Sequence, residues 1–139
     1  MSTLSDLATA VVTRLNDASL SQEFTAARAY VPSYELPDLE DLTVQVIVER
    51  GSVEIHDRGK FQRTYMARIV VQKLVDAQTL AEVDAMETLV EEIDELFAGV
   101  HLSGVYWESS TFSNPRDPGK LETHRQFTSV LTITYYAIA

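Results

Sequence analysis

The sequence predicts an α+β domain, in which two helices pack against one face of a mostly antiparallel sheet of four or five strands. Two observations lead to this fold class. Apolar residues recur at helical spacing in two segments, whereas several others alternate between apolar and polar residues as strands do. Their order is helix, strand, strand, strand, helix, strand, strand, and strands joined by short links usually pair as antiparallel hairpins.

The size and composition fit one domain, residues 1–139. The chain has 139 residues, of which 45% are hydrophobic, so it can bury a core without a disulfide or metal. It has no cysteine, which excludes thiol nucleophiles and Cys-ligated metals. The N-terminus lacks the basic region of a signal peptide, and no apolar run reaches the roughly 20 residues that span a bilayer.

The formal net charge is −10, with 21 acidic and 11 basic residues. Phosphate binding needs clustered lysine and arginine, so neither free nucleic acid nor an anionic membrane is an expected partner.

The first helix is predicted over residues 5–17, where Leu4, Leu7, Val11 and Leu15 recur at helical spacing. A short strand over 23–31 follows and ends at Pro32. An acidic connector with two prolines, residues 32–41, leads to a strand over 42–50 that is expected to end at Gly51. In this strand Val44, Val46 and Val48 share one face.

The next segment, 51–60, is polar, and it is either a hairpin connection or a pair of short strand extensions. A long strand is predicted over 61–75. Its alternation assigns the core face to Tyr65, Ala67, Ile69 and Val71, whereas the opposite face is only partly polar.

The second helix has the clearest pattern in the chain. Thr79 and Glu82 form a capping box before the apolar periodicity, and Gly99 stands where a helix commonly stops. Residues 76–97 contain eight acidic side chains and no basic one, so much of the net charge lies on this helix. The expected buried stripe is Val83, Met86, Val90, Ile93 and Phe97, flanked by Leu89 and Leu96.

Two final strands are predicted over 105–112 and 125–138, joined by a turn-rich loop over 113–124. In the last strand the core face is assigned to Phe127, Leu131, Ile133 and Tyr135.

No residue pattern in the chain specifies a reaction. The acidic run 91–95 is interpreted as a solvated helix face, because no histidine stands three or four residues away to complete a metal site. His56, His101 and His124 have no paired spacing, and there is no nucleophile elbow or glycine-rich phosphate loop. Hence no catalytic residue, cofactor or metal is predicted, and an enzyme is not the expected class.

The order of several segments, over nearly the full chain, resembles a known pattern. The run F-x-x-x-R-x-Y-V-P-x-Y-E-L-P-D-L-E-D-L-x-V-x-V over 24–46, the strand Y-x-x-x-I-x-V-Q-K over 65–73 and the helix segment L-V-E-E-I over 89–93 follow one another in this order. A short helix precedes them and a long strand ends the chain. The whole resembles the tail and neck completion proteins of long-tailed bacteriophages, and most of all the tail terminators.

This resemblance implies a virion structural protein without catalytic residues. Such proteins form a ring, commonly hexameric, on the last ring of the tail tube, where they stop tube growth and present a surface to the head connector. The implied partners are further copies of the chain, the tail-tube protein and the neck proteins, with genomic DNA passing through the ring without specific binding. The implied location is the tail or neck of the virion, assembled in the host cytoplasm.

A ring subunit needs two unlike surfaces, and mixed-charge loops suit such contacts. The connector could dock on a neighbour, since its prolines lower the entropy lost on binding, or it could fold back on its own domain. The candidate interface residues of the connector are Tyr34, Leu36 and Leu39. Those of the two loops are Glu54, His56, Asp57, Arg58 and Lys60, and Arg116, Asp117, Lys120 and Glu122.

The alternatives left open are a head-closure or adaptor neck protein, a small-molecule-binding α+β domain or enzyme, and a bacterial adaptor or toxin-immunity protein. The acidic helix could face the ring's channel or the outer solvent, and solvation alone accounts for its pattern.

Overall fold

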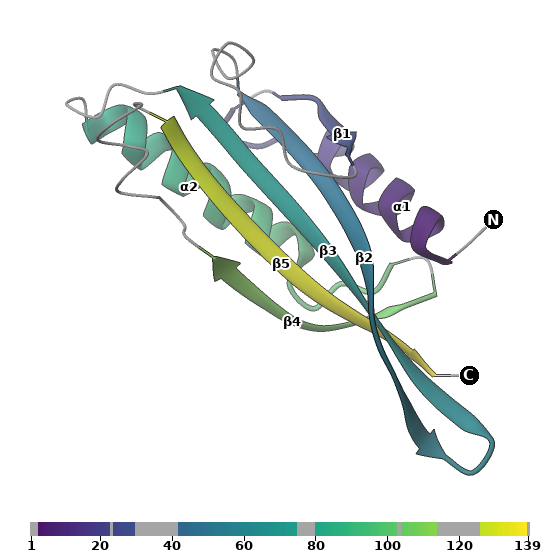
Figure 1. The fold of residues 1–139 in the computed structure, drawn as a ribbon. Coiled ribbons are helices and arrows are strands. Elements are labelled where there is room, and N and C mark those ends of the chain that lie inside the picture. Colours follow the sequence, from purple (N-terminus) through teal and green to yellow (C-terminus); the bar gives the residue numbers. More distant parts are fainter. Residues whose placement is uncertain are drawn as a thin grey trace.

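The computed structural model describes residues 3–22, 24–29, 42–74, 80–102, 104–113 and 126–138 (Figure 1). Its elements follow the predicted order. They are α1 (Thr3–Asp17), β1 (Ala26–Arg28), β2 (Thr43–Asp57), β3 (Lys60–Leu74), α2 (Leu80–Phe97), β4 (Tyr106–Ser113) and β5 (Gln126–Ile138).

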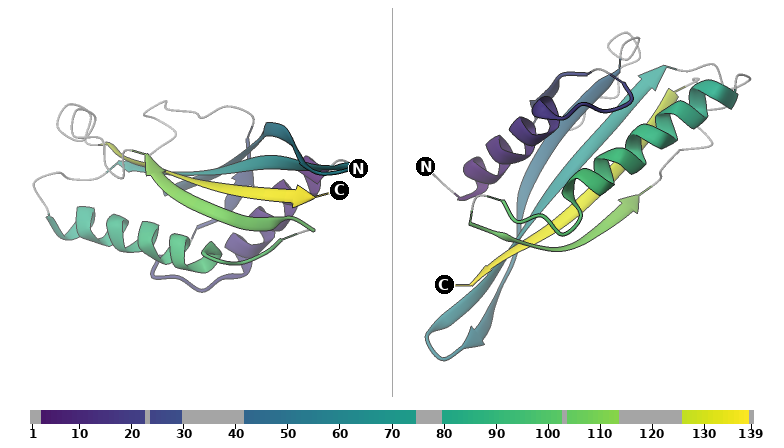
Figure 2. Two further views of the ribbon diagram at one scale, coloured as in Figure 1. Left: turned by 90° about the horizontal axis from the view of Figure 1, so that it is seen from below. Right: turned by 180° about the vertical axis from the view of Figure 1, so that it is seen from behind.

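The five strands form one sheet in the order β1-β2-β3-β5-β4. Three of the four pairings are antiparallel, and β1 runs parallel to β2. Both helices lie on the same face of this sheet, α1 over the β1–β2 side and α2 over the β3–β5 side (Figure 2). The predicted fold class, with a mostly antiparallel sheet, is therefore confirmed, and the one parallel pair joins the two strands on either side of the predicted connector.

Strand β1 is shorter than expected, three residues instead of nine, and a side chain of α1 anchors it. The amide of Asn16 pairs with the backbone of Ala26, accepting its N–H at 2.7 Å and donating to its carbonyl at 3.2 Å. An asparagine side chain thereby replaces the backbone partner that a longer strand pair would provide.

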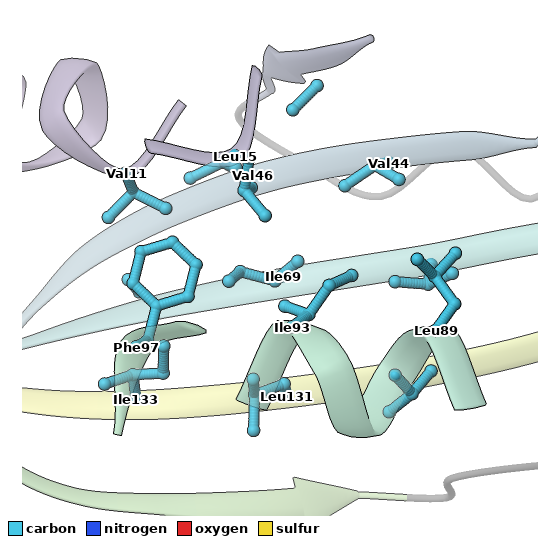
Figure 3. Packing of buried hydrophobic residues seen from close by; sticks show 14 of the residues in the cluster. Val11, Leu15, Val44, Val46, Ile69, Leu89, Ile93, Phe97, Leu131 and Ile133 are labelled. Atoms are coloured by element: carbon cyan, nitrogen blue, oxygen red, sulfur yellow. The ribbon is translucent and has the colours of Figure 1, made fainter. Parts of the chain in front are cut away.

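The core lies between the two helices and the sheet (Figure 3). Val11 and Leu15 of α1 meet Val44 and Val46 of β2, and the apolar stripe of α2 meets β3 and β5. Every residue of the predicted α2 stripe is buried, and so are all those assigned to the core faces of β3 and β5. Gly99 follows the helix with φ 74°, the left-handed conformation of a helix stop. Thr79, the predicted cap, lies outside the described residues.

The expectation that Gly51 ends the second strand is wrong. Strand β2 continues to Asp57, so the interpretation of 51–60 as a pair of strand extensions is the correct one. Arg50 pairs with Tyr65 and Val53 with Arg63, so β2 carries one extra residue here, a β-bulge. A Cβ at Gly51 would lie 3.2 Å from the side chain of Thr64, so glycine allows the close approach at this bulge.

Part of the sheet face that points away from the helices is buried as well. Val70 and Gln72 of β3 point to this face, and they are 1% and 0% exposed. The side-chain amide of Gln72 has no hydrogen-bond partner among the described residues.

The packing of α2 leads to a first prediction. Ile93 is 1% exposed, so Ile93→Asp places an unpaired carboxylate beneath the helix and should cost several kcal/mol, a large part of the roughly 5–15 kcal/mol that stabilises a domain. Ile55→Asp is a matched control, because the same chemical change falls on a side chain that is 81% exposed. Denaturant unfolding of dilute protein should show a loss only for Ile93→Asp. Equal stability of the two variants would mean that α2 buries another face.

A second prediction concerns Tyr135, which is fully buried and whose hydroxyl has no hydrogen-bond partner among the described residues. Burial raises the pKa of this phenol, and the charge of Arg14 opposes the shift only in part. Tyr135→Phe should therefore leave the free energy of unfolding unchanged or raise it by up to about 1 kcal/mol.

The raised pKa of Tyr135 also fixes the direction of a pH effect. Above about pH 10 the unfolded chain loses this proton while the folded protein keeps it, so stability present below pH 10 is lost as the pH rises. The loss should be smaller in Tyr135→Phe than in the natural chain, and Tyr106→Phe, at an exposed position, controls for removal of a hydroxyl. A cost above about 1 kcal/mol for Tyr135→Phe at neutral pH would show that the hydroxyl is hydrogen-bonded.

Candidate functional site

The predicted interface residues divide into two groups. Those of the segment 51–60 lie together on the hairpin between β2 and β3: Glu54, His56, Asp57, Arg58 and Lys60. Those of the connector and of the loop 113–124 lie outside the described residues: Tyr34, Leu36, Leu39, Arg116, Asp117, Lys120 and Glu122.

The hairpin projects beyond the sheet as a two-stranded ribbon (Figures 1 and 2). Strand β5 pairs with β3 only as far as Gln62, and β1 pairs with β2 only at residues 44–46. All of residues 50–61 are consequently exposed. We call residues 50–63 the hairpin arm.

A tight turn closes the tip of the hairpin arm. The carboxylate of Asp57 accepts a hydrogen bond from the N–H of Arg58 at 2.7 Å. Gly59 has φ 77°, a left-handed conformation that glycine adopts without steric cost. Asp57 pairs with Lys60 across the turn, so the cations Arg58 and Lys60 are held at the outermost point of the molecule.

One face of the hairpin arm is apolar. Ile55 pairs with Phe61 and Val53 with Arg63, and directly paired residues share a face. On β3 this face continues the core row of Tyr65, but no described helix covers it. The exposed fractions are 61% for Val53, 81% for Ile55 and 43% for Phe61. The guanidinium of Arg63 lies 5.9 Å from the centre of the Phe61 ring and covers part of this face.

This apolar face is the feature that sequence reasoning missed. The segment contains two glycines and several charged residues, so it was interpreted as polar. The signal that identifies it is the alternation of Val53 and Ile55 beyond Gly51, which continues the pattern of a strand.

The hairpin arm and α2 carry opposite charge. The arm has four basic residues, Arg50, Arg58, Lys60 and Arg63, and two acidic ones, Glu54 and Asp57, which gives a net charge of +2. Helix α2 has no basic residue and a net charge of −7, from Glu82, Asp84, Glu87, Glu91, Glu92, Asp94 and Glu95.

The outer face of α2 is a solvated acidic surface, as the sequence predicted. Glu82, Asp84, Glu91 and Glu95 are exposed, whereas Glu92 accepts hydrogen bonds from the N–H and the hydroxyl of Ser21. Near its C-terminal end, α2 receives a hydrogen bond from Arg14, whose Nε lies 2.9 Å from the carbonyl oxygen of Leu96. This contact ties α1 to α2 and places a cation at the negative end of the helix dipole.

A hollow of about 280 Å³ lies between α2 and β4, lined by Glu87, Val90, Glu91 and Phe112. Val90 is buried and Phe112 is 36% exposed, so the two supply apolar surface, while the two glutamates bring negative charge to it. We call it the α2–β4 hollow. It joins residues 21 or more positions apart in sequence, and no local pattern predicted it.

The two histidines that the structure describes, His56 and His101, do not converge on a site. His56 is exposed on the hairpin arm, and His124 lies outside the described residues. His101 has a structural role, because its Nδ1 accepts the backbone N–H of Trp107 at 3.1 Å and its ring lies 4.9 Å from that of Tyr106. In the described part of the chain, no three histidine or acidic side chains are grouped so that they could hold a metal ion.

Neither described helix is long and apolar enough to cross a bilayer. In comparison with known proteins, no family model matches the chain and no curated sequence matches it.

Proposed function

We propose that this protein is a virion structural protein of a long-tailed bacteriophage, a tail terminator that assembles as a ring at the head-proximal end of the tail tube. The observation that carries the proposal is the pair of unlike surfaces on one small domain. The hairpin arm is basic with an exposed apolar face, and the α2–β4 hollow is acidic with apolar walls.

Unlike surfaces favour head-to-tail association of identical subunits. When the surface that inserts differs from the surface that receives it, a row of associated copies has one unused surface at each end. Both are used only when the row closes into a ring. A ring also suits the proposed task, since it can cover the end of a tube while leaving a central passage for DNA.

The fold agrees with what the resemblance to tail terminators implies, a sheet with flanking helices. Its polar surfaces also fit the proposed partners. With a net charge of −10, the protein repels DNA instead of holding it, which suits a channel through which the genome slides. The ring would contact the tail-tube protein on one side and the head-tail connector on the other.

The nearest rival role is that of a head-closure or adaptor protein of the same neck, which would bind the connector without touching the tube. The two roles differ in one measurable respect, namely whether the protein stops tube polymerisation.

The proposed function predicts that the purified protein limits tail-tube growth. Tube protein of the parent phage should polymerise into tubes of indefinite length alone, and into short tubes capped at one end when this protein is added before polymerisation. Electron microscopy of negatively stained tubes gives the length distribution, and light scattering gives the particle mass of the added protein. Bovine serum albumin, another acidic protein, is the control for nonspecific effects of added charge.

Unchanged tube lengths, with no added density at either tube end, would refute the terminator role. If the protein instead joins purified connectors, the adaptor role replaces it.

A further inference from the structure

We propose that the hairpin arm of one copy docks into the α2–β4 hollow of a second copy, with Ile55 entering the hollow and the cations of the arm facing its glutamates. This inference deepens the proposed ring function, on which it rests for its biological role. The observation behind it is a match of chemistry between two surfaces of the same chain that lie apart in the fold.

The hairpin arm exposes apolar side chains to solvent. An isolated two-stranded hairpin is at best marginally stable in water. Exposed apolar side chains on such a hairpin are typical of a surface that packs against another molecule. Ile55 is 81% exposed at a point where the chain has formed a regular, paired strand. A segment that is already paired as a strand loses less entropy when it binds than an unpaired segment does, which favours a docking role.

The α2–β4 hollow is large enough for an aliphatic side chain. The α2–β4 hollow has a volume of about 280 Å³, and a cavity of roughly 150 Å³ already holds benzene. Val90 and Phe112 provide the apolar contacts that a branched aliphatic residue requires.

The tip of the arm and the lining of the hollow carry opposite charge. Arg58 and Lys60 stand at the tip beside Ile55, and Glu87 and Glu91 line the hollow. Opposite charges around an apolar contact select orientation and partner. A partner surface that lacks carboxylates would not make these contacts, and α2 displays seven of them without a basic residue.

The arm and the hollow of one chain lie too far apart to contact each other. Phe112 of β4 pairs with Leu131 of β5, and Leu131 pairs in turn with Ile69 of β3. Along β3, Ile69 and Phe61 are eight residues apart. At about 3.3 Å per strand residue, the hollow and the base of the tip are roughly 26 Å apart along the sheet. The arm leads away from α2 (Figure 1), so the arm of a chain cannot reach the hollow of that same chain, and docking needs the arm of a second copy.

The test compares self-association of matched variants by sedimentation equilibrium over a range of concentrations. Ile55→Asp and Glu91→Lys should each weaken association by tenfold or more. Glu95→Lys is the control for Glu91→Lys, since it makes the same change of charge on the same helix at an exposed residue that does not line the hollow. All three should keep the melting temperature of the natural chain at high dilution.

Two further experiments test the direction of the contact. Arg58→Glu and Glu91→Lys combined in one chain restore opposite charges across the contact, so association should recover relative to either single variant. In an equimolar mixture of the two single variants, the Ile55→Asp chain keeps an intact hollow and the Glu91→Lys chain keeps an intact arm. It should therefore form one-to-one dimers and nothing larger, whereas the natural chain forms larger assemblies.

The docking inference is overturned if the natural chain stays monomeric at millimolar concentration, or if Ile55→Asp and Glu91→Lys associate like the natural chain. It is equally overturned if Glu95→Lys weakens association as much as Glu91→Lys, or if Ile55→Asp abolishes binding to tube protein while self-association persists. None of these outcomes tests the terminator role, which the tube-length measurement decides separately. Conversely, if the chain associates through arm and hollow but leaves tube lengths unchanged, the proposed function is refuted and the docking contact is supported.

Discussion

The packing of α2 on the sheet is the contact on which the other features depend. Its buried stripe, with Leu89, Ile93 and Phe97 at the centre, fixes the rotation of the helix about its axis. Once that stripe faces β3 and β5, the seven carboxylates of the helix are placed on or near its outer surface. The same rotation brings Val90 and Glu91 to the side that meets β4, where Phe112 completes the α2–β4 hollow. The acidic surface is thus a consequence of core packing.

A mismatch of lengths creates the hairpin arm. Strands β2 and β3 have 15 residues each and span about 50 Å at roughly 3.3 Å per residue, whereas the 18 residues of α2 span only about 27 Å at 1.5 Å per residue. A helix layer of this length cannot cover the whole of the two strands. The alternation of apolar residues nevertheless continues past the covered part, through Val53 and Ile55. Apolar surface that the domain has no layer to bury is the expected property of a segment that packs against another molecule.

The sequence predicted those parts of the fold in which one local period decides the outcome. The stripe of α2 and the core row of β3 follow periods of 3.6 and 2, and both were found because many consecutive positions agree. At Gly51 the local sequence does not decide the outcome, because a glycine in a strand marks either its end or a bulge. The pairing of Arg50 with Tyr65 and of Val53 with Arg63 shows that it is a bulge. The α2–β4 hollow was beyond reach, because Glu91 and Phe112 meet through tertiary packing alone.

Charge separation within the chain gives the proposed contact its direction. Two copies with a net charge of −10 repel each other at long range, and this repulsion is screened beyond about 8 Å at physiological ionic strength. Contacts between the cations at the tip of the arm and the carboxylates around the hollow act at shorter range, where an apolar residue also excludes water. Random encounters are therefore disfavoured. In the proposed orientation, the arm with a net charge of +2 contacts α2 with a net charge of −7, so the contact is favoured by both electrostatic attraction and apolar burial. Under the proposed docking, this distribution of charge keeps separate copies apart except in the head-to-tail orientation.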